Sequence, residues 1–172
     1  MKTKKELNSL KNEVYVKYFN EQIRDEWWNK KKPYAAKENL LASIPVLIKT
    51  QEYLIKKKLK TTYVKKLAGN YNYINCHLKT CLKAKTNDHI VGVKRIGNIV
   101  WDSIEEKSLT LKNHKEWIYD NLFLWGKVQM TGDQHKKVEV NPDHLKDNLR
   151  FKHYPRNLQK EIMKQLAQIN KN

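Results

Sequence analysis

The sequence predicts a mostly helical α+β fold, in which a small core of two strands and one helix carries helical extensions at both ends. Apolar residues recur at three- and four-residue intervals near both termini, which is the spacing of amphipathic helices. In the middle of the chain, residues 78–85 and 127–130 instead show the near-alternation typical of half-buried strands. The expected regions are a helical region in residues 1–70, the core in residues 71–140 and a helical extension in residues 141–172.

The composition favours a polyanionic partner. The chain has 172 residues with 35 Lys or Arg and 18 Asp or Glu, so its formal net charge is +17. Such an excess attracts polyanions, and nucleic acid, DNA or RNA, is the leading candidate. No apolar run approaches the roughly 18 residues that a membrane-spanning helix needs, and the N-terminus is charged where a signal peptide would be apolar. We therefore expect a cytoplasmic protein without a membrane partner.

The N-terminal region is expected to begin with a helix over residues 4–31, ended by Lys30–Lys32 and Pro33. Trp27 and Trp28, next to that lysine run, allow two interpretations. In one, the indoles stack on nucleobases and the lysines contact phosphates. In the other, the aromatic edge packs in the core and the lysines are solvated.

A second helical region is expected over residues 37–68. Ser43 followed by Pro45 fits a helix start, and Pro45 argues against one unbroken helix. Opposite the apolar face lies the densest basic cluster of the chain, which either contacts phosphate groups or forms an ordinary solvated face. The cluster consists of Lys56, Lys57, Lys58, Lys60, Lys65 and Lys66.

The candidate site begins at Asp88 and His89, at the end of the first predicted strand. After the second strand, Thr131 and Gln134 have the spacing of a capping box, which starts a helix. His135 then falls in the first turn of that helix. A carboxylate and an imidazole suit a loosely held divalent cation, and a second imidazole has a pKa suited to a general base. The pattern could thus gather two metal ligands and a base in one small site.

These residues resemble the HNH nucleases with their ββα-metal core, and in particular phage-type, homing-like members. The matching segments are residues 88–92 and 128–138. The resemblance implies that Asp88 and His135 hold one divalent cation, Mg²⁺ or Mn²⁺, and that His89 is the general base. For a phage-encoded protein, the expected location becomes the cytoplasm of the host cell.

The sequence departs from the family at the middle Asn of the motif, which usually lies at the start of the second strand. Aligning on His135 places that position near Gly126, and the nearest candidate is Asn121. Asn113 and Glu116 form a second capping-box pattern, so Asn121 is expected on an inserted helix. Asn121 is therefore carried over as a catalytic candidate from the resemblance alone.

Further phosphate contacts follow from the same resemblance. In the family a loop between the strands lies against the DNA backbone, which assigns Lys94 and Arg95 to phosphate, with ordinary surface charge as the alternative. Lys136, just after His135, is a further candidate. Between the strands, a short helix is expected around residues 101–107, and from Arg156 onward the chain is amphipathic again.

Cysteine usage argues against a structural zinc. Many HNH proteins hold zinc with two pairs of cysteines, whereas this chain has only Cys76 and Cys81. Both are expected to be reduced thiols, because disulfides are rare inside cells.

Two functions from different classes remain open. The first is a metal-dependent HNH-type endonuclease that hydrolyses phosphodiester bonds in DNA. The alternative is a non-catalytic, basic DNA- or RNA-binding protein that uses a degenerate HNH-like core as scaffold. The pattern favours no particular oligomeric state.

Overall fold

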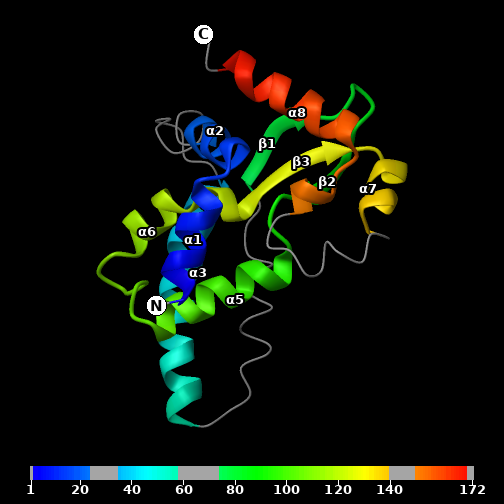
Figure 1. Cartoon of the computed structure of the whole chain (residues 1–172). Coiled ribbons are helices and arrows are strands. Elements are labelled where there is room, and N and C mark those ends of the chain that lie inside the picture. The colour runs from blue at the N-terminus through cyan, green and yellow to red at the C-terminus, as the bar shows by residue number, and fades with distance from the viewer. Residues whose placement is uncertain (1, 24–34, 58–73, 140–149, 170–172) are drawn as a thin grey trace.

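The computed structural model describes residues 2–23, 35–57, 74–139 and 150–169 (Figure 1). The fold is mostly helical α+β, as predicted from the sequence. Its α-helices are α1 (Lys2–Lys11), α2 (Val14–Ile23), α3 (Ala35–Lys56), α5 (Val93–Glu105), α6 (His114–Asp120), α7 (Gly132–Glu139) and α8 (Arg156–Ile169), with short 3-10 helices η2 (Leu122–Trp125) and η4 (Arg150–His153).

A three-stranded sheet lies at the centre, in the order β1-β3-β2. It consists of β1 (Ile74–Lys79), β2 (Thr86–His89) and β3 (Gly126–Met130). β2 runs antiparallel to β3, and this pair followed by α7 forms the expected strand–strand–helix unit. β1 pairs with the other edge of β3 in parallel, which adds a strand that the sequence did not predict.

The first predicted strand, residues 78–85, is wrong in position. Its first two residues end β1, and the chain then turns, with the Ala84 amide donating to the Cys81 carbonyl (3.1 Å). Leu82 in this turn is fully exposed, so the alternating pattern ran across a loop and not along one strand. The prediction that Asp88 and His89 end a strand is confirmed, because they are the last two residues of β2.

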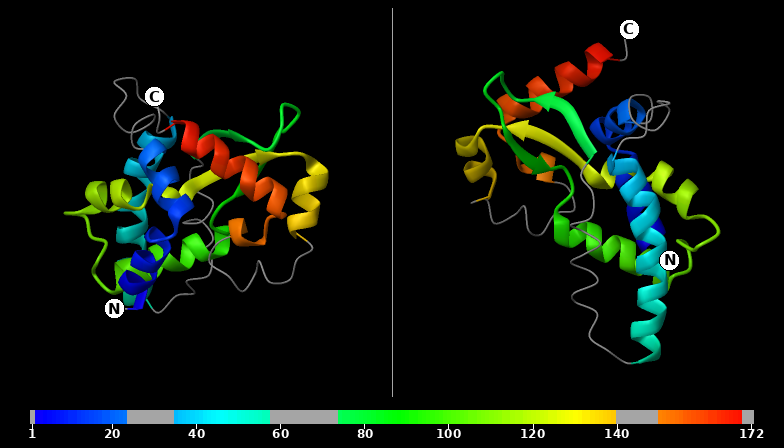
Figure 2. Two further views of the ribbon diagram at one scale, coloured as in Figure 1. Left: turned by 45° about the horizontal axis from the view of Figure 1, so that its top comes forward. Right: turned by 180° about the vertical axis from the view of Figure 1, so that it is seen from behind.

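Helices cover the sheet from several directions (Figure 2). α8 packs along β1 and against α2, while α7 lies beside β2. A second group of helices continues the same apolar core: α1 and α3 both contact α5, and α3 also contacts α6. Large side chains from both parts are fully buried, among them Phe19, Ile44, Ile99, Phe123 and Trp125.

The single N-terminal helix expected over residues 4–31 is wrong. The chain turns at Asn12 and Glu13, and α1 and α2 are separate helices. The Glu13 carbonyl accepts the Lys17 amide (3.1 Å) and so starts α2. Asn competes for backbone hydrogen bonds and favours such a break. Residues 24–31, including Trp27 and Trp28, lie outside the described residues.

The helix start expected at Ser43 is also wrong, because α3 begins at Ala35 and continues through Pro45. Proline lacks the N–H that would reach the Leu41 carbonyl, so the helix loses that hydrogen bond. Leu40 and Ile44 before the proline and Leu47 and Ile48 after it are all buried. Packing of this face on both sides of Pro45 explains why the helix is not interrupted.

α5 is longer than the helix expected around residues 101–107 and carries Lys94 and Arg95 in its first turn. It ends in a Schellman motif, in which the Ser108 amide donates to the Ser103 carbonyl (3.0 Å) and the Lys107 amide to the Ile104 carbonyl (3.0 Å). Lys107 has a φ of 59° at the position where glycine is usual.

α6 begins where the sequence predicted, but its capping box is wrong. Asn113 makes no side-chain cap to α6. Its Oδ1 instead accepts from the Thr110 amide (2.8 Å), and its Nδ2 donates to the Ser108 carbonyl (2.8 Å). The Asn113 side chain therefore stabilises the preceding loop.

Candidate metal centre

The helix start that positions His135 forms as the sequence predicted. The Thr131 amide donates to Gln134 Oε1 (2.9 Å), and the Gln134 amide donates to Thr131 Oγ1 (3.2 Å). These are the two reciprocal bonds of a capping box. The His135 amide completes the first turn by donating to the Thr131 carbonyl (3.0 Å). Thr80 Oγ1 lies 2.5 Å from Gln134 Oε1 and ties the β1–β2 loop to the same cap.

The structure brings Asp88 and His135 together, as predicted. His135 Nε2 lies 3.2 Å from Asp88 Oδ1 and 3.8 Å from Glu139 Oε1. One ligand atom from each of these three residues lies within 4.8 Å of the other two. Glu139 was missed in the sequence, although its position four residues after His135 places both side chains on one helix face.

The donor set fits a single divalent cation. Two carboxylates and one imidazole supply two hard oxygen donors and one borderline nitrogen donor, a set that a divalent cation can take. Neighbouring ligands of an octahedral Mg²⁺ lie about 3 Å apart, given bonds of about 2.1 Å. The 3.2 Å between His135 Nε2 and Asp88 Oδ1 is close to that spacing. Asp88 is 1% exposed and Glu139 is exposed, so the three atoms reach from the interior to the surface.

Asp88 is also held by two residues that the sequence did not single out. Two guanidinium nitrogens of Arg150 donate to it, Nη2 at 2.7 Å from Oδ1 and Nε at 3.3 Å from Oδ2. The Tyr154 hydroxyl donates to Oδ2 at 2.5 Å. Arg150 Nη2 further contacts Glu139 Oε1 (2.9 Å). Burial opposes the charge on Arg150, but the two carboxylates outweigh burial and raise the pKa of the guanidinium.

His89 lies next to Asp88 on β2, opposite Lys127 on β3. Burial lowers the pKa of His89 to about 4, the positive charge of Lys127 adds to this effect, and Asp88 opposes it. The imidazole is therefore neutral near neutral pH. Lys127 is itself buried, which lowers its pKa to about 8 against the opposing charge of Asp88. Lys127 was missed because only strand pairing brings it across from His89.

Asn121 is not brought to this site. It lies between α6 and η2, is 3% exposed and donates from Nδ2 to the Trp117 carbonyl (2.7 Å). Figure 1 shows α6 at the opposite end of the molecule from α7. The aligned position, Gly126, has no room for a side chain, because a Cβ there would overlap the Phe19 ring. Asn121 therefore lies apart from the Asp88 cluster, where the resemblance would have placed it.

The predicted phosphate contacts have different surroundings. Lys56, Lys57, Lys94 and Lys136 are exposed. Arg95 instead forms an ion pair with Glu6 of α1, so it has a structural partner within the chain. Lys58 and Lys60 lie outside the described residues. Cys81 is an exposed free thiol.

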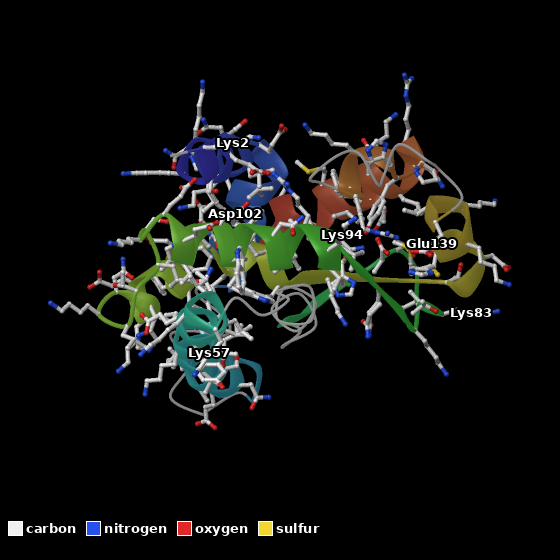
Figure 3. All side chains as sticks on the ribbon, turned by 90° about the horizontal axis from the view of Figure 1, so that it is seen from below. Lys2, Lys57, Lys83, Lys94, Asp102 and Glu139 are labelled. Atoms are coloured by element: carbon white, nitrogen blue, oxygen red, sulfur yellow. The ribbon has the colours of Figure 1, made fainter. Side chains whose placement is uncertain are left out.

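Among the described residues, lysines project from several separate parts of the molecule. In Figure 3, Lys2 on α1, Lys57 after α3 and Lys83 in the β1–β2 loop project from well-separated parts of the chain. Charge distributed in this way attracts a polyanion from many directions.

Comparisons with known proteins add no relative. The chain has no significant match to a protein-family model, a curated protein or a solved structure. The HNH resemblance thus stays a prediction that depends on the site residues themselves. In the described part of the chain, every helix is too short or too polar to cross a lipid bilayer.

Proposed function

We propose that this protein is a metal-dependent endonuclease of the HNH type that hydrolyses phosphodiester bonds in DNA. The observation that carries the proposal is the convergence of Asp88, His135 and Glu139 within 4.8 Å, with His89 adjacent on β2. These residues come from the end of β2 and from the first and last turns of α7, in a strand–strand–helix unit. A pure scaffold needs no such set of ligand atoms next to a histidine.

A phosphodiester resists hydrolysis because its charged oxygens repel a nucleophile, so a base must activate water and positive charge must act on the phosphate. A bound Mg²⁺ or Mn²⁺ supplies that positive charge. His89 accepts a proton from the attacking water, and Asp88, His135 and Glu139 hold the cation. Lys127, opposite His89, adds a second positive charge beside the reacting group.

The contacts to Asp88 are compatible with a metal ligand. A carboxylate has about four lone-pair sites. Asp88 Oδ2 accepts from Arg150 Nε and from the Tyr154 hydroxyl, and Asp88 Oδ1 accepts from Arg150 Nη2. Asp88 Oδ1 also lies 3.2 Å from His135 Nε2. A cation held by these two atoms would replace their direct contact, and Arg150 and Tyr154 would orient the ligand as outer partners commonly do.

The test is cleavage of supercoiled plasmid by purified protein with Mg²⁺, with Mn²⁺ and with EDTA. We expect cleavage that requires the divalent ion and that the substitution Asp88→Asn removes. Structured RNA assayed in parallel decides whether DNA is the substrate. Failure of the wild-type protein to cleave DNA with any divalent ion would reject the proposal.

The second candidate is a non-catalytic DNA- or RNA-binding protein with an HNH-like scaffold. Arg150 favours it, because this residue already pairs with both Asp88 and Glu139 and balances their charge without a metal. The absence of an Asn side chain at position 126 also favours this candidate. This candidate predicts salt-dependent binding to nucleic acid, no cleavage, and no change in binding when Mn²⁺ is added.

A further inference from the structure

A cavity of about 290 Å³ lies between α1, α6 and the loop that joins α5 to α6. It is far along the molecule from α7 and the Asp88 cluster, as Figure 1 shows for α1 and α6. Its volume is at the small end of the range for ligand pockets, which suits one compact ligand. None of the residues predicted to bind metal lines it.

Three lysines line this cavity, and they give it a strongly positive character. Lys4 and Lys11 come from α1, and Lys107 comes from the α5–α6 loop. Lys4 and Lys107 are exposed, so their ammonium groups can reach an anion at the mouth. Three lysines against Asp120, the one acidic residue among those lining the cavity, favour a ligand that carries phosphate.

The inner wall offers a different chemistry. Leu7 and Trp117 supply apolar and aromatic surface. Asn121 also lines the cavity and is 3% exposed. Its Nδ2 donates to the Trp117 carbonyl (2.7 Å), which fixes the amide, and its Oδ1 is buried without a hydrogen-bond donor among the described residues. A buried acceptor of this kind normally has a partner, and a ligand N–H would provide one.

We propose that this cavity binds a single nucleoside phosphate. The lysines contact the phosphate, the base lies against Trp117 and Leu7, and an N–H of the base donates to Asn121 Oδ1. Asn suits this role because its amide oxygen can accept from the exocyclic amine of adenine. The ligand is a free mononucleotide or an unpaired nucleotide of a nucleic-acid strand. The site is independent of the proposed endonuclease activity.

Lys107 permits a test that does not endanger the fold. Its φ of 59° lies in the left-handed region, where glycine is favoured over other residues. Lys107→Gly therefore removes the ammonium group and also relieves the backbone. Lys112→Gly is the matched control, because Lys112 is an exposed lysine of the same loop that does not line the cavity.

The experiment is calorimetric titration of the full-length protein with adenosine monophosphate, adenosine and inorganic phosphate, all in EDTA so that no metal site contributes. We expect the monophosphate to bind at least about 10-fold more tightly than adenosine or phosphate, since it uses both ends of the cavity. Lys107→Gly should weaken it about 5- to 10-fold, the effect of one charge-assisted contact, and Lys112→Gly should leave it unchanged.

The proposal is overturned if the monophosphate does not bind, if phosphate alone binds as tightly, or if the two glycine variants weaken binding equally. A 5′-phosphorylated oligoadenylate titrated against the same variants identifies the source of the ligand. Tighter binding than the monophosphate, still sensitive to Lys107→Gly, assigns an unpaired nucleotide of a strand. Weaker binding assigns the free mononucleotide.

Discussion

Arg150 holds Asp88 in a two-point contact, with Nη2 2.7 Å from Oδ1 and Nε 3.3 Å from Oδ2, across 62 positions of sequence. The Arg150 amide also donates to the Ile90 carbonyl (2.7 Å), so η4 is anchored to the chain just after β2. Asp88 is 1% exposed and its charge needs this partner. The C-terminal segment is therefore part of the site's construction.

Replacement of Arg150 should strongly destabilise the fold. Arg150→Met leaves a buried carboxylate without its cation, and the expected loss in free energy of unfolding is about 3–5 kcal/mol. Urea denaturation of the two proteins measures it. Lys152→Met is the control, because Lys152 forms a more exposed ion pair with Glu13 (2.8 Å) and should cost about 1 kcal/mol or less. Equal losses in the two variants would contradict the structural role of Arg150.

Metal binding should depend on all three ligand residues. His135→Ala should weaken Mn²⁺ binding by about 10-fold or more, and Glu139→Gln should weaken it less because Glu139 is exposed. Isothermal calorimetry with Mn²⁺ measures both effects. Glu116→Gln, at an exposed position of α6 outside the cluster, should have no effect. Unchanged Mn²⁺ affinity in His135→Ala would remove this residue from the metal centre.

Gly126 should tolerate no side chain. Gly126→Ala places a methyl group on the Phe19 ring, and the expected loss in stability is about 1–3 kcal/mol. Phe19→Leu in the same chain should recover part of that loss by vacating the space. Gly132→Ala is the control, since a Cβ there meets nothing within 4 Å and alanine favours the helix. Thermal melts of the four proteins test the argument, and a Gly126→Ala protein as stable as wild type would refute it.

The parts of the site encoded by short-range pattern were predictable. Thr131 and Gln134 set the start of α7, and this alone placed His135 in its first turn. Glu139 could have been added from its four-residue spacing to His135. Arg150 and Tyr154 could not, because nothing local marks a residue that pairs with a carboxylate 62 or 66 positions away.

The fold errors have the same origin. Pro45 is a local signal for interruption, but burial of Ile44 and Leu47 on either side outweighs it. The parallel pairing of β1 with β3 joins Ile74 to Gly126, and no hydrophobic period reveals such a distant partner. Nothing in the sequence around Gly126 indicates that Phe19 packs against it. Tertiary packing decided each of these points.

The basic cluster that begins at Lys56, the last residue of α3, should contribute affinity for nucleic acid without sequence preference. Lysine is a point charge suited to phosphate, whereas arginine is the usual partner of bases. Replacing Lys56, Lys57, Lys58 and Lys60 by Gln should weaken binding to all DNA sequences alike. It should also reduce the slope of log affinity against log salt by about 0.9 for each phosphate that the protein no longer neutralises. Gel-shift titrations over a range of salt concentrations measure this slope. An unchanged slope would contradict the prediction.

The substitution His89→Ala separates an enzyme from a binding protein. A general base acts only in the transition state, so its removal should lower the cleavage rate by roughly 10²- to 10⁴-fold and leave DNA affinity nearly unchanged. A histidine that serves only the packing between β2 and β3 would instead lower the melting temperature on replacement, and binding and cleavage would fall together.

Three measurements on wild type and His89→Ala distinguish these outcomes: gel-shift affinity, a thermal melt, and plasmid cleavage with Mg²⁺ or Mn²⁺. His153→Ala is a matched control, because His153 is a partly exposed histidine of η4 outside the metal cluster. Cleavage that survives in a well-folded His89→Ala protein would exclude His89 as the base. If the cleavage rate falls while DNA affinity and melting temperature stay unchanged, His89 acts in the chemical step.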